Sequence, residues 1–211
     1  MTMDISIAEG LYLIALDDDE GRLLAAAEKN IVEGLLSASI LELIVLEKVG
    51  AVNGRLTKLS SDGTGNILLD NVFSALEDGK TVIQNLKELA PHFKNVQDDV
   101  TEMLIARGVL KRESTKLLWI PVSERMDNAN YAYEQNIRDT ITGIVKEGNK
   151  PSSTFVVLTS LIYFCHLLPE IFKDGDDHID AVKVAKDILK SDSISGEVMI
   201  VLDDLKSHFD H

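Results

Sequence analysis

The stretch FVVLTSLIYFCHLL, residues 155–168, decides the fold of this chain of 211 residues. It is the most apolar run in the sequence, yet it is shorter than the roughly 18 residues that a membrane-spanning helix needs. Its length is also unusual for a strand, which rarely exceeds about 10 residues. A helix that is apolar on all sides is typical of the centre of a helical domain. We therefore predict a buried central helix from Phe155 to Leu168.

Composition favours one acidic globular domain. The chain is 45% hydrophobic, which is enough for a substantial core, and no long Pro/Gly/Ser-rich linker divides it. Its formal net charge of −14 disfavours nucleic-acid binding and general attraction to anionic membranes. The single cysteine excludes an internal disulfide and a cysteine-based zinc cluster. The first ten residues, MTMDISIAEG, do not resemble a signal peptide, so we expect a cytoplasmic protein.

Helical signals surround the central stretch. Ser6 and Glu9 have capping-box spacing, Gly34 is a candidate break, and Gly50 is a candidate C-cap. Pro151 precedes the central helix, with Ser152 or Ser153 as its cap. The other predicted helices are Ser6–Leu16, Leu23–Val49, Leu68–Glu77, Thr81–Leu89, Lys94–Arg107, Asn130–Lys146, Ile179–Lys190 and Glu197–Phe209.

Two short hairpins are predicted between these helices. Residues 51–59 read as a strand pair turned at Asn53-Gly54, and residues 109–110 and 116–122 read as strands that flank a polar turn. A helix followed by a hairpin also describes a winged helix. The helices that would enter a DNA groove, however, carry acidic residues, which repel phosphates: Glu42, Glu47, Asp98, Asp99 and Glu102. We predict no DNA binding.

Two acidic segments could suggest a metal site, and we interpret neither as one. Asp17, Asp19 and Glu28 have part of the ligand spacing of a calcium loop. Gly21 stands where this loop needs an acidic ligand, however, and Arg22 where it needs a glycine. We therefore interpret the acidic turn as a solvated turn. The second segment is interpreted as complementing a helix dipole: Asp176, Asp177, His178 and Asp180. We expect no metal and no cofactor.

Catalytic signatures are absent from the sequence. It has no Gly-x-Ser-x-Gly, no His-Glu-x-x-His and no Gly-x-Gly-x-x-Gly motif. Cys165 and His166 are adjacent, but successive side chains on a helix point about 100° apart, so they cannot act as a nucleophile and base pair. We expect a buried thiol and a hydrogen-bonded core histidine. An enzyme with an acidic cleft at Asp18, Asp19 or His178 is kept as a remote alternative.

Several segments, in order, resemble the Golgi phosphoprotein 3 family. They are the opening helix and acidic turn Ile7–Gly21, the Leu-Glu-Leu motif Leu41–Leu43, the segment Thr64–Asp70 (TGNILLD), the segment Leu104–Leu110 (LIARGVL) and the strand KLLWIPV at residues 116–122. The resemblance implies a mostly helical single domain over residues 1–211, with amphipathic helices around the central apolar one.

What the resemblance implies for function is a non-enzymatic peripheral membrane adaptor. Known members bind phosphatidylinositol 4-phosphate and act as adaptors that link glycosyltransferases to retrograde carriers. Their basic, disordered N-terminal tail has no counterpart before the domain here, so the chain resembles a bacterial member. We expect it in the cytoplasm or on the cytoplasmic face of a membrane.

The family's lipid pocket is mostly substituted in this sequence. Its tryptophan and its first arginine match Ala27 and Leu36, and its arginine pair matches Lys94 and Gln97. A phosphomonoester usually needs several Arg or Lys donors. Only Lys94 keeps a positive charge among the four positions.

Two functions therefore remain open. A weak binder of anionic lipid headgroups would bring Lys94 together with Lys111 or Arg112, whereas a soluble protein-interaction module would use the fold without lipid. The family hairpin also implies self-association, here through Trp119 and Ile120, while its expected tip at residues 123–127 is too polar to favour membrane insertion.

Overall fold

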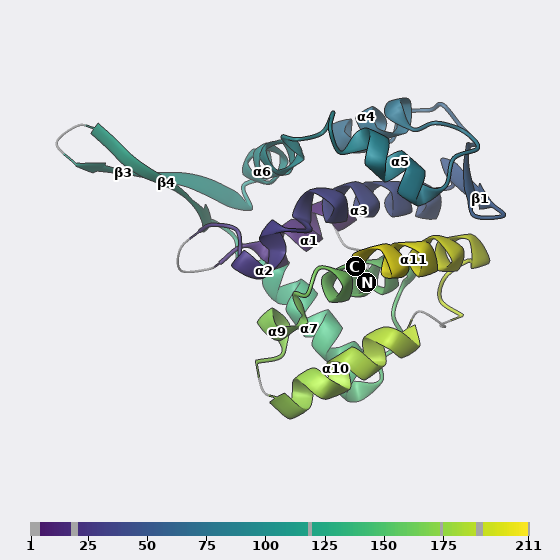
Figure 1. Cartoon of the computed structure of the whole chain (residues 1–211). Coiled ribbons are helices and arrows are strands. Elements are labelled where there is room, and N and C mark those ends of the chain that lie inside the picture. The colour runs from purple at the N-terminus through teal and green to yellow at the C-terminus, as the bar shows by residue number, and fades with distance from the viewer. Residues whose placement is uncertain (1–4, 18–20, 118–119, 174, 189–191, 211) are drawn as a thin grey trace.

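The computed structural model describes residues 5–17, 21–117, 120–173, 175–188 and 192–210, and only the backbone of residues 113–117, 120–125 and 128. The described chain is mostly helical, with two antiparallel hairpins (Figure 1). Its helices are α1 (Ile7–Ala15), α2 (Ala25–Glu28), α3 (Ile31–Val45), α4 (Ile67–Ala75), α5 (Val82–Leu89), α6 (Val96–Ala106), α7 (Ala132–Glu147), α8 (Ser153–Phe164), α9 (Leu168–Ile171), α10 (Gly175–Ile188) and α11 (Gly196–Phe209). Its strands are β1 (Val49–Val52), β2 (Arg55–Lys58), β3 (Leu110–Leu117) and β4 (Ile120–Asn128).

The predicted central helix is confirmed as α8, but it is shorter than predicted. Ser152 caps its start by accepting a hydrogen bond from the Phe155 N–H. The helix ends at Phe164, because His166 adopts a left-handed conformation with φ of 60°. Residues 155–162 are all buried, and α8 packs against α1, α3, α10 and α11.

Helix α3 shares the centre with α8. Its side chains are buried on every face, and α1, α4, α5, α6, α8, α11 and β1 all pack on it. The predicted break at Gly34 is wrong, since this residue lies inside α3. A Cβ atom at Gly34 would lie 2.8 Å from the Sγ atom of Cys165, so the glycine allows α3 and α8 to approach closely.

Local cap and turn signals account for most other element ends. Ser6 and Glu9 form the predicted capping box of α1, and Gly148 ends α7 in a left-handed conformation. The Asn53-Gly54 turn joins β1 to β2 as predicted. Gly50 is not a helix cap, because it lies in β1 and pairs with Thr57.

The second hairpin is much longer than predicted and projects away from the helices (Figure 1). The sequence placed its turn between residues 110 and 116, but these residues lie in β3, and residues 123–127 lie in β4 rather than at the tip. The strands are joined at residues 118–119, so Trp119 lies outside the described residues, and Ile120 is described only as the first backbone position of β4.

The base of this hairpin is held by the acidic turn that follows α1. The Met126 N–H donates to the Gly21 carbonyl over 2.9 Å, and the Gly21 N–H donates to the Asp17 carbonyl over 2.8 Å. Gly21 has φ of 60°, and a Cβ atom there would lie 2.0 Å from the Met126 carbonyl oxygen. Only glycine fits this contact.

Candidate functional site

The four positions that the resemblance assigns to a lipid pocket do not form a basic pocket. Ala27 on α2 and Leu36 on α3 are fully buried, so neither side chain can contact a dissolved ligand. Lys94 lies exposed in the turn before α6, and Gln97 is half-buried in the first turn of α6. None of the four lines either of the grooves described below.

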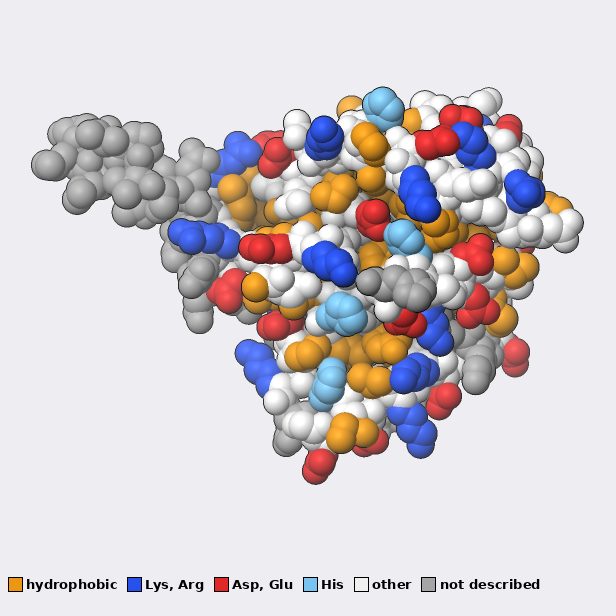
Figure 2. Space-filling model, viewed as in Figure 1, with side chains coloured by type: hydrophobic (Ala, Val, Ile, Leu, Met, Phe, Trp, Pro, Cys, Tyr) orange, Lys and Arg blue, Asp and Glu red, His pale blue; other side chains and the backbone are white. Residues whose placement is uncertain are grey.

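Both cations that were expected beside Lys94 pair with carboxylates. Lys111 pairs with Asp127 at 3.1 Å, and Arg112 pairs with Glu102. Within the described residues, Lys94 itself makes no ion pair. Figure 2 shows Lys and Arg side chains interspersed with Asp and Glu over the viewed face, with no single basic area there.

A groove of about 290 Å³ runs between α4 and α6. Its apolar lining comes from Ile67, Leu68, Met103 and Ala106, and its polar lining from Asn71, Asp99 and Glu102. Ile67 is 69% exposed, the largest exposed fraction among the described large hydrophobic side chains. The groove can therefore bury an apolar side chain beside two carboxylates.

A second groove, of about 410 Å³, lies at the end of α3 beside the first hairpin. It is more polar than the first one. Leu59, which is 60% exposed, lies at its edge together with two exposed carboxylates. Its lining residues are Ile44, Val45, Glu47, Val49, Leu59, Ser153, Ser193, Ser195, Glu197 and Val198.

Two carboxylates and a guanidinium meet where α1, α3 and α6 join. Glu9 is fully buried, and its Oε1 atom lies 2.9 Å from Nε of Arg107. The Ile7 N–H donates to Oε2 of Glu42 over 2.7 Å. Burial raises the pKa of Glu42 from 4.5 to about 7, against the lowering effect of this hydrogen bond. We name Glu9, Glu42 and Arg107 the buried charge cluster.

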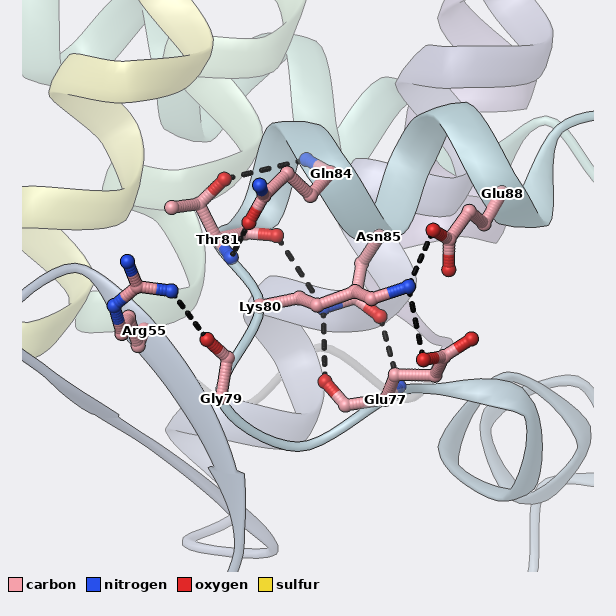
Figure 3. Close-up of polar contacts among 8 residues, drawn as sticks. All are labelled: Arg55, Glu77, Gly79, Lys80, Thr81, Gln84, Asn85 and Glu88. Carbon is pink, nitrogen blue, oxygen red and sulfur yellow. Dashed lines mark hydrogen bonds and ion pairs between the residues drawn. The ribbon is translucent and has the colours of Figure 1, made fainter.

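A second set of two carboxylates and one cation lies at the surface, in the loop between α4 and α5 and on α5 itself (Figure 3). The Lys80 ammonium lies 2.8 Å from Oε2 of Glu77 and also pairs with Glu88. These contacts raise the pKa of Lys80, and the bonds from Lys80 and Glu88 lower the pKa of Glu77. We name Glu77, Lys80 and Glu88 the exposed charge cluster.

The backbone around the exposed cluster is fixed by buried amide contacts. The Asn85 side chain accepts from the Glu77 N–H over 2.8 Å and donates to the Glu77 and Thr81 carbonyls. Arg55 donates to the Gly79 carbonyl over 2.6 Å, which ties β2 to this loop. Thr81 and Gln84 form a capping box for α5, and their spacing in the sequence is the signal that could have predicted it.

The residues considered for metal binding or catalysis are not brought together. Among the described residues, no three His, Cys, Asp or Glu side chains are placed to share a metal ion. Asp177 pairs with Lys146 at 2.5 Å, and Glu28 lies exposed on α2. Asp18 and Asp19 lie outside the described residues.

Cys165 and His166 have opposite environments. Cys165 is buried as predicted, and burial raises the pKa of its thiol to about 12, which keeps it protonated and unreactive. The prediction of a core histidine is wrong, because His166 is exposed. The left-handed turn that ends α8 directs this residue out of the core.

Comparisons of the sequence with known proteins and protein families show where this chain belongs. Every helix in the described parts of the chain is too short or too polar to span a membrane. A search of curated proteins by sequence gives no match. The sequence model of the family Golgi phosphoprotein 3 (GPP34) matches residues 7–204, which is nearly the whole chain. This protein therefore belongs to the Golgi phosphoprotein 3 family.

Proposed function

We propose that this protein is a non-enzymatic adaptor that acts through protein–protein contact at the α4/α6 groove. The observation that carries the proposal is the groove's combination of an apolar lining with the highly exposed Ile67 at its edge. Exposed apolar surface beside a preformed groove is typical of interaction sites.

Charge indicates the kind of segment that fits this groove. Asp99 makes no ion pair with any described residue, and Glu102 pairs only with the half-exposed Arg112. Such an exposed pair contributes little and is easily exchanged for another partner. A partner segment with an apolar anchor and a neighbouring Lys or Arg would complement the groove and the net charge of −14.

Co-purification from the native host, in detergent, tests the proposal. The tagged wild-type chain should retain a protein partner that Ile67→Asp loses. Ile179→Asp is the matched control, since Ile179 is 67% exposed on α10, away from the groove. A partner retained equally by both variants, or a clean monomer from the wild-type chain, would contradict the proposal.

The second candidate is the family role, a peripheral membrane adaptor that binds phosphatidylinositol 4-phosphate on the cytoplasmic face of a membrane. It is supported by family membership and by Lys94, exposed at a position that matches the family's pocket. A single lysine is a weak site for a phosphomonoester, which is usually held by several cations.

Liposome flotation separates this candidate from the first. Vesicles with phosphatidylinositol 4-phosphate should float the wild-type protein better than vesicles without it, and Lys94→Glu should remove the difference. Lys87→Glu, an exposed lysine on α5, is the control. Equal and negligible flotation with both vesicles would rule out this role. Self-association through Trp119 and Ile120 remains a prediction, to be tested by sedimentation of a Trp119→Ser variant.

A further inference from the structure

Exposed apolar side chains gather where the end of α3, the first hairpin and α11 meet. These three elements pack on one another, and the start of α11 lies beside the first hairpin (Figure 1). The Leu59 N–H donates to the Lys48 carbonyl over 2.8 Å, and a Cβ atom at Gly54 would lie 3.7 Å from Ile200. Four of the seven large hydrophobic side chains that are exposed in the described chain belong here, whereas the other three are spread over α4, the start of α7 and α10: Leu46, Val52, Leu59 and Ile200. Such a concentration is typical of an interaction site.

The groove of about 410 Å³ among these elements has an acidic lining, and we name it the α3-end groove. Of the described residues that line it, only Glu47 and Glu197 are charged, and both are exposed. Neither makes an ion pair with any described residue. The rest of the lining consists of apolar side chains and three serines. The groove therefore offers apolar contact and two carboxylates that are available to a cation.

Glu47 occupies a position that is unfavourable for a glutamate. It follows the C-cap of α3 with φ of 56°, a left-handed conformation in which glycine is usual. Two backbone hydrogen bonds fix this turn: the Glu47 N–H donates to the Ile44 carbonyl over 3.0 Å, and the next N–H donates to the Leu43 carbonyl over 2.9 Å. The dipole at the C-terminal end of a helix also repels a carboxylate and attracts a cation. A cation on a bound partner would relieve this repulsion.

Helices α6 and α8 end in the same type of turn as α3. Gly108 takes the left-handed position after α6, and His166 takes it after α8 with φ of 60°. His166 is exposed, and it lies at the opposite end of α8 from Ser153, which lines the α3-end groove. Glycine at position 166 would thus relieve the same backbone conformation without changing the groove, which makes His166 a matched control for Glu47.

We propose that the α3-end groove is a second docking site, which binds a protein segment that places an apolar side chain on Leu59 and a Lys or Arg beside Glu47 and Glu197. Charge selects this occupant. A second copy of this chain, with its net charge of −14, would bring further carboxylates to the groove, and an anionic membrane surface would be repelled. The α3-end groove shares no lining residue with the α4/α6 groove, so the two sites are independent and the protein can hold two partners at once.

Selection from a displayed library of random peptides tests the site. The bait carries Ile67→Asp, so that the α4/α6 groove does not compete, and the enriched peptides are synthesised and titrated against further variants of this bait. Peptides that combine apolar residues with Lys or Arg should be enriched, and Leu59→Asp should weaken their binding about ten-fold or more, because it removes exposed apolar surface at the groove. Ile179→Asp, at an exposed position on α10, should not change binding. The absence of enriched peptides, enrichment of peptides without a cation, or unchanged binding to Leu59→Asp would overturn the proposal.

Glycine at position 47 should change stability and affinity in opposite directions. Glu47→Gly relieves the left-handed conformation, so the melting temperature should rise by about 2 °C, while the lost carboxylate should lower peptide affinity about two- to five-fold. His166→Gly should raise the melting temperature and leave affinity unchanged. Glu28→Gln removes one negative charge at an exposed position on α2 and should also leave affinity unchanged. Unchanged affinity in Glu47→Gly, or an equal loss in either control, would refute the role of Glu47 in docking.

Discussion

The buried and exposed charge clusters have the same composition, two glutamates and one cation, and opposite electrostatics. In the buried cluster the pKa of Glu42 is raised to about 7, whereas in the exposed cluster the pKa of Glu77 is lowered. Desolvation is the largest contribution to the first shift, and hydrogen bonding to Lys80 the largest to the second. Desolvation thus favours the protonated form of Glu42, whereas hydrogen bonding favours the charged form of Glu77.

The largest expected effect comes from removing the buried cluster's cation. Arg107→Met removes the cation that lies beside the two carboxylates, so the free energy of unfolding at pH 8 should fall by about 3 kcal/mol. This is the low end of the range for a broken buried ion pair, because the Arg107 side chain is partly exposed. Urea denaturation measures the change. Lys29→Met, at the exposed C-cap of α2, is the control, and equal losses in both variants would contradict the role of the cluster.

The next effect is a change in how stability depends on pH. The pKa of Glu42 is higher in the folded chain than its unfolded value of 4.5, so its stabilisation is complete below pH 4.5 and is lost as pH rises to about 7. Glu42→Gln removes this loss and should raise the free energy of unfolding at pH 8 by about 1–2 kcal/mol, within the ~1.4 kcal/mol per pH unit that linkage allows.

Urea melts at several pH values check this prediction. The stability of Glu42→Gln should decline less than that of the wild-type chain between pH 4.5 and 7, while Glu28→Gln follows the wild type. A variant that is less stable than the wild type at pH 8 would show that the charge on Glu42 is favourable.

Removing the exposed cluster's cation should have a smaller effect. Lys80→Met breaks two ion pairs that water already screens, so the denaturation midpoint should fall slightly at low salt and match that of the wild type at about 1 M salt. Lys87→Met, at an exposed position on α5 without an ion pair among the described residues, serves as the control. A large loss that persists at high salt would mean that Lys80 acts through packing.

The smallest effect is expected at acid pH. Because the pKa of Glu77 is lowered in the folded chain, its stabilisation is present above the usual value of 4.5 and is lost as pH falls below it. Glu77→Gln should therefore flatten the pH dependence of the melting temperature only below pH 4.5. A change confined to neutral pH would contradict the assignment.

Sequence reasoning succeeded where the deciding interaction is local. The capping box of Ser6 and Glu9 and the Asn53-Gly54 turn each act within a few residues, and both are confirmed. The apolar run at residues 155–164 was also sufficient to predict a buried helix, because a helix without a polar face is not stable at the protein surface.

Long-range contacts account for the errors. The role of Gly34 depends on Cys165, which is distant in sequence, so a close approach of two helices looked like a helix break. The partner of Ile7 is Glu42, and no spacing rule connects them. The hairpin turn was misplaced because residues 111–115 are polar, although paired strands that project into solvent can be polar on both faces.

The contact between Gly21 and Met126 has a consequence for the substitutions that this chain can tolerate. The contact is made by main-chain atoms, so it does not require a particular side chain at position 126. It does require glycine at position 21, because a Cβ atom there would clash with the Met126 carbonyl oxygen. Substitution of the Met126 side chain therefore leaves these main-chain contacts available. In this chain the direction of the hairpin is thus set in part by a glycine that lies far from it in the sequence.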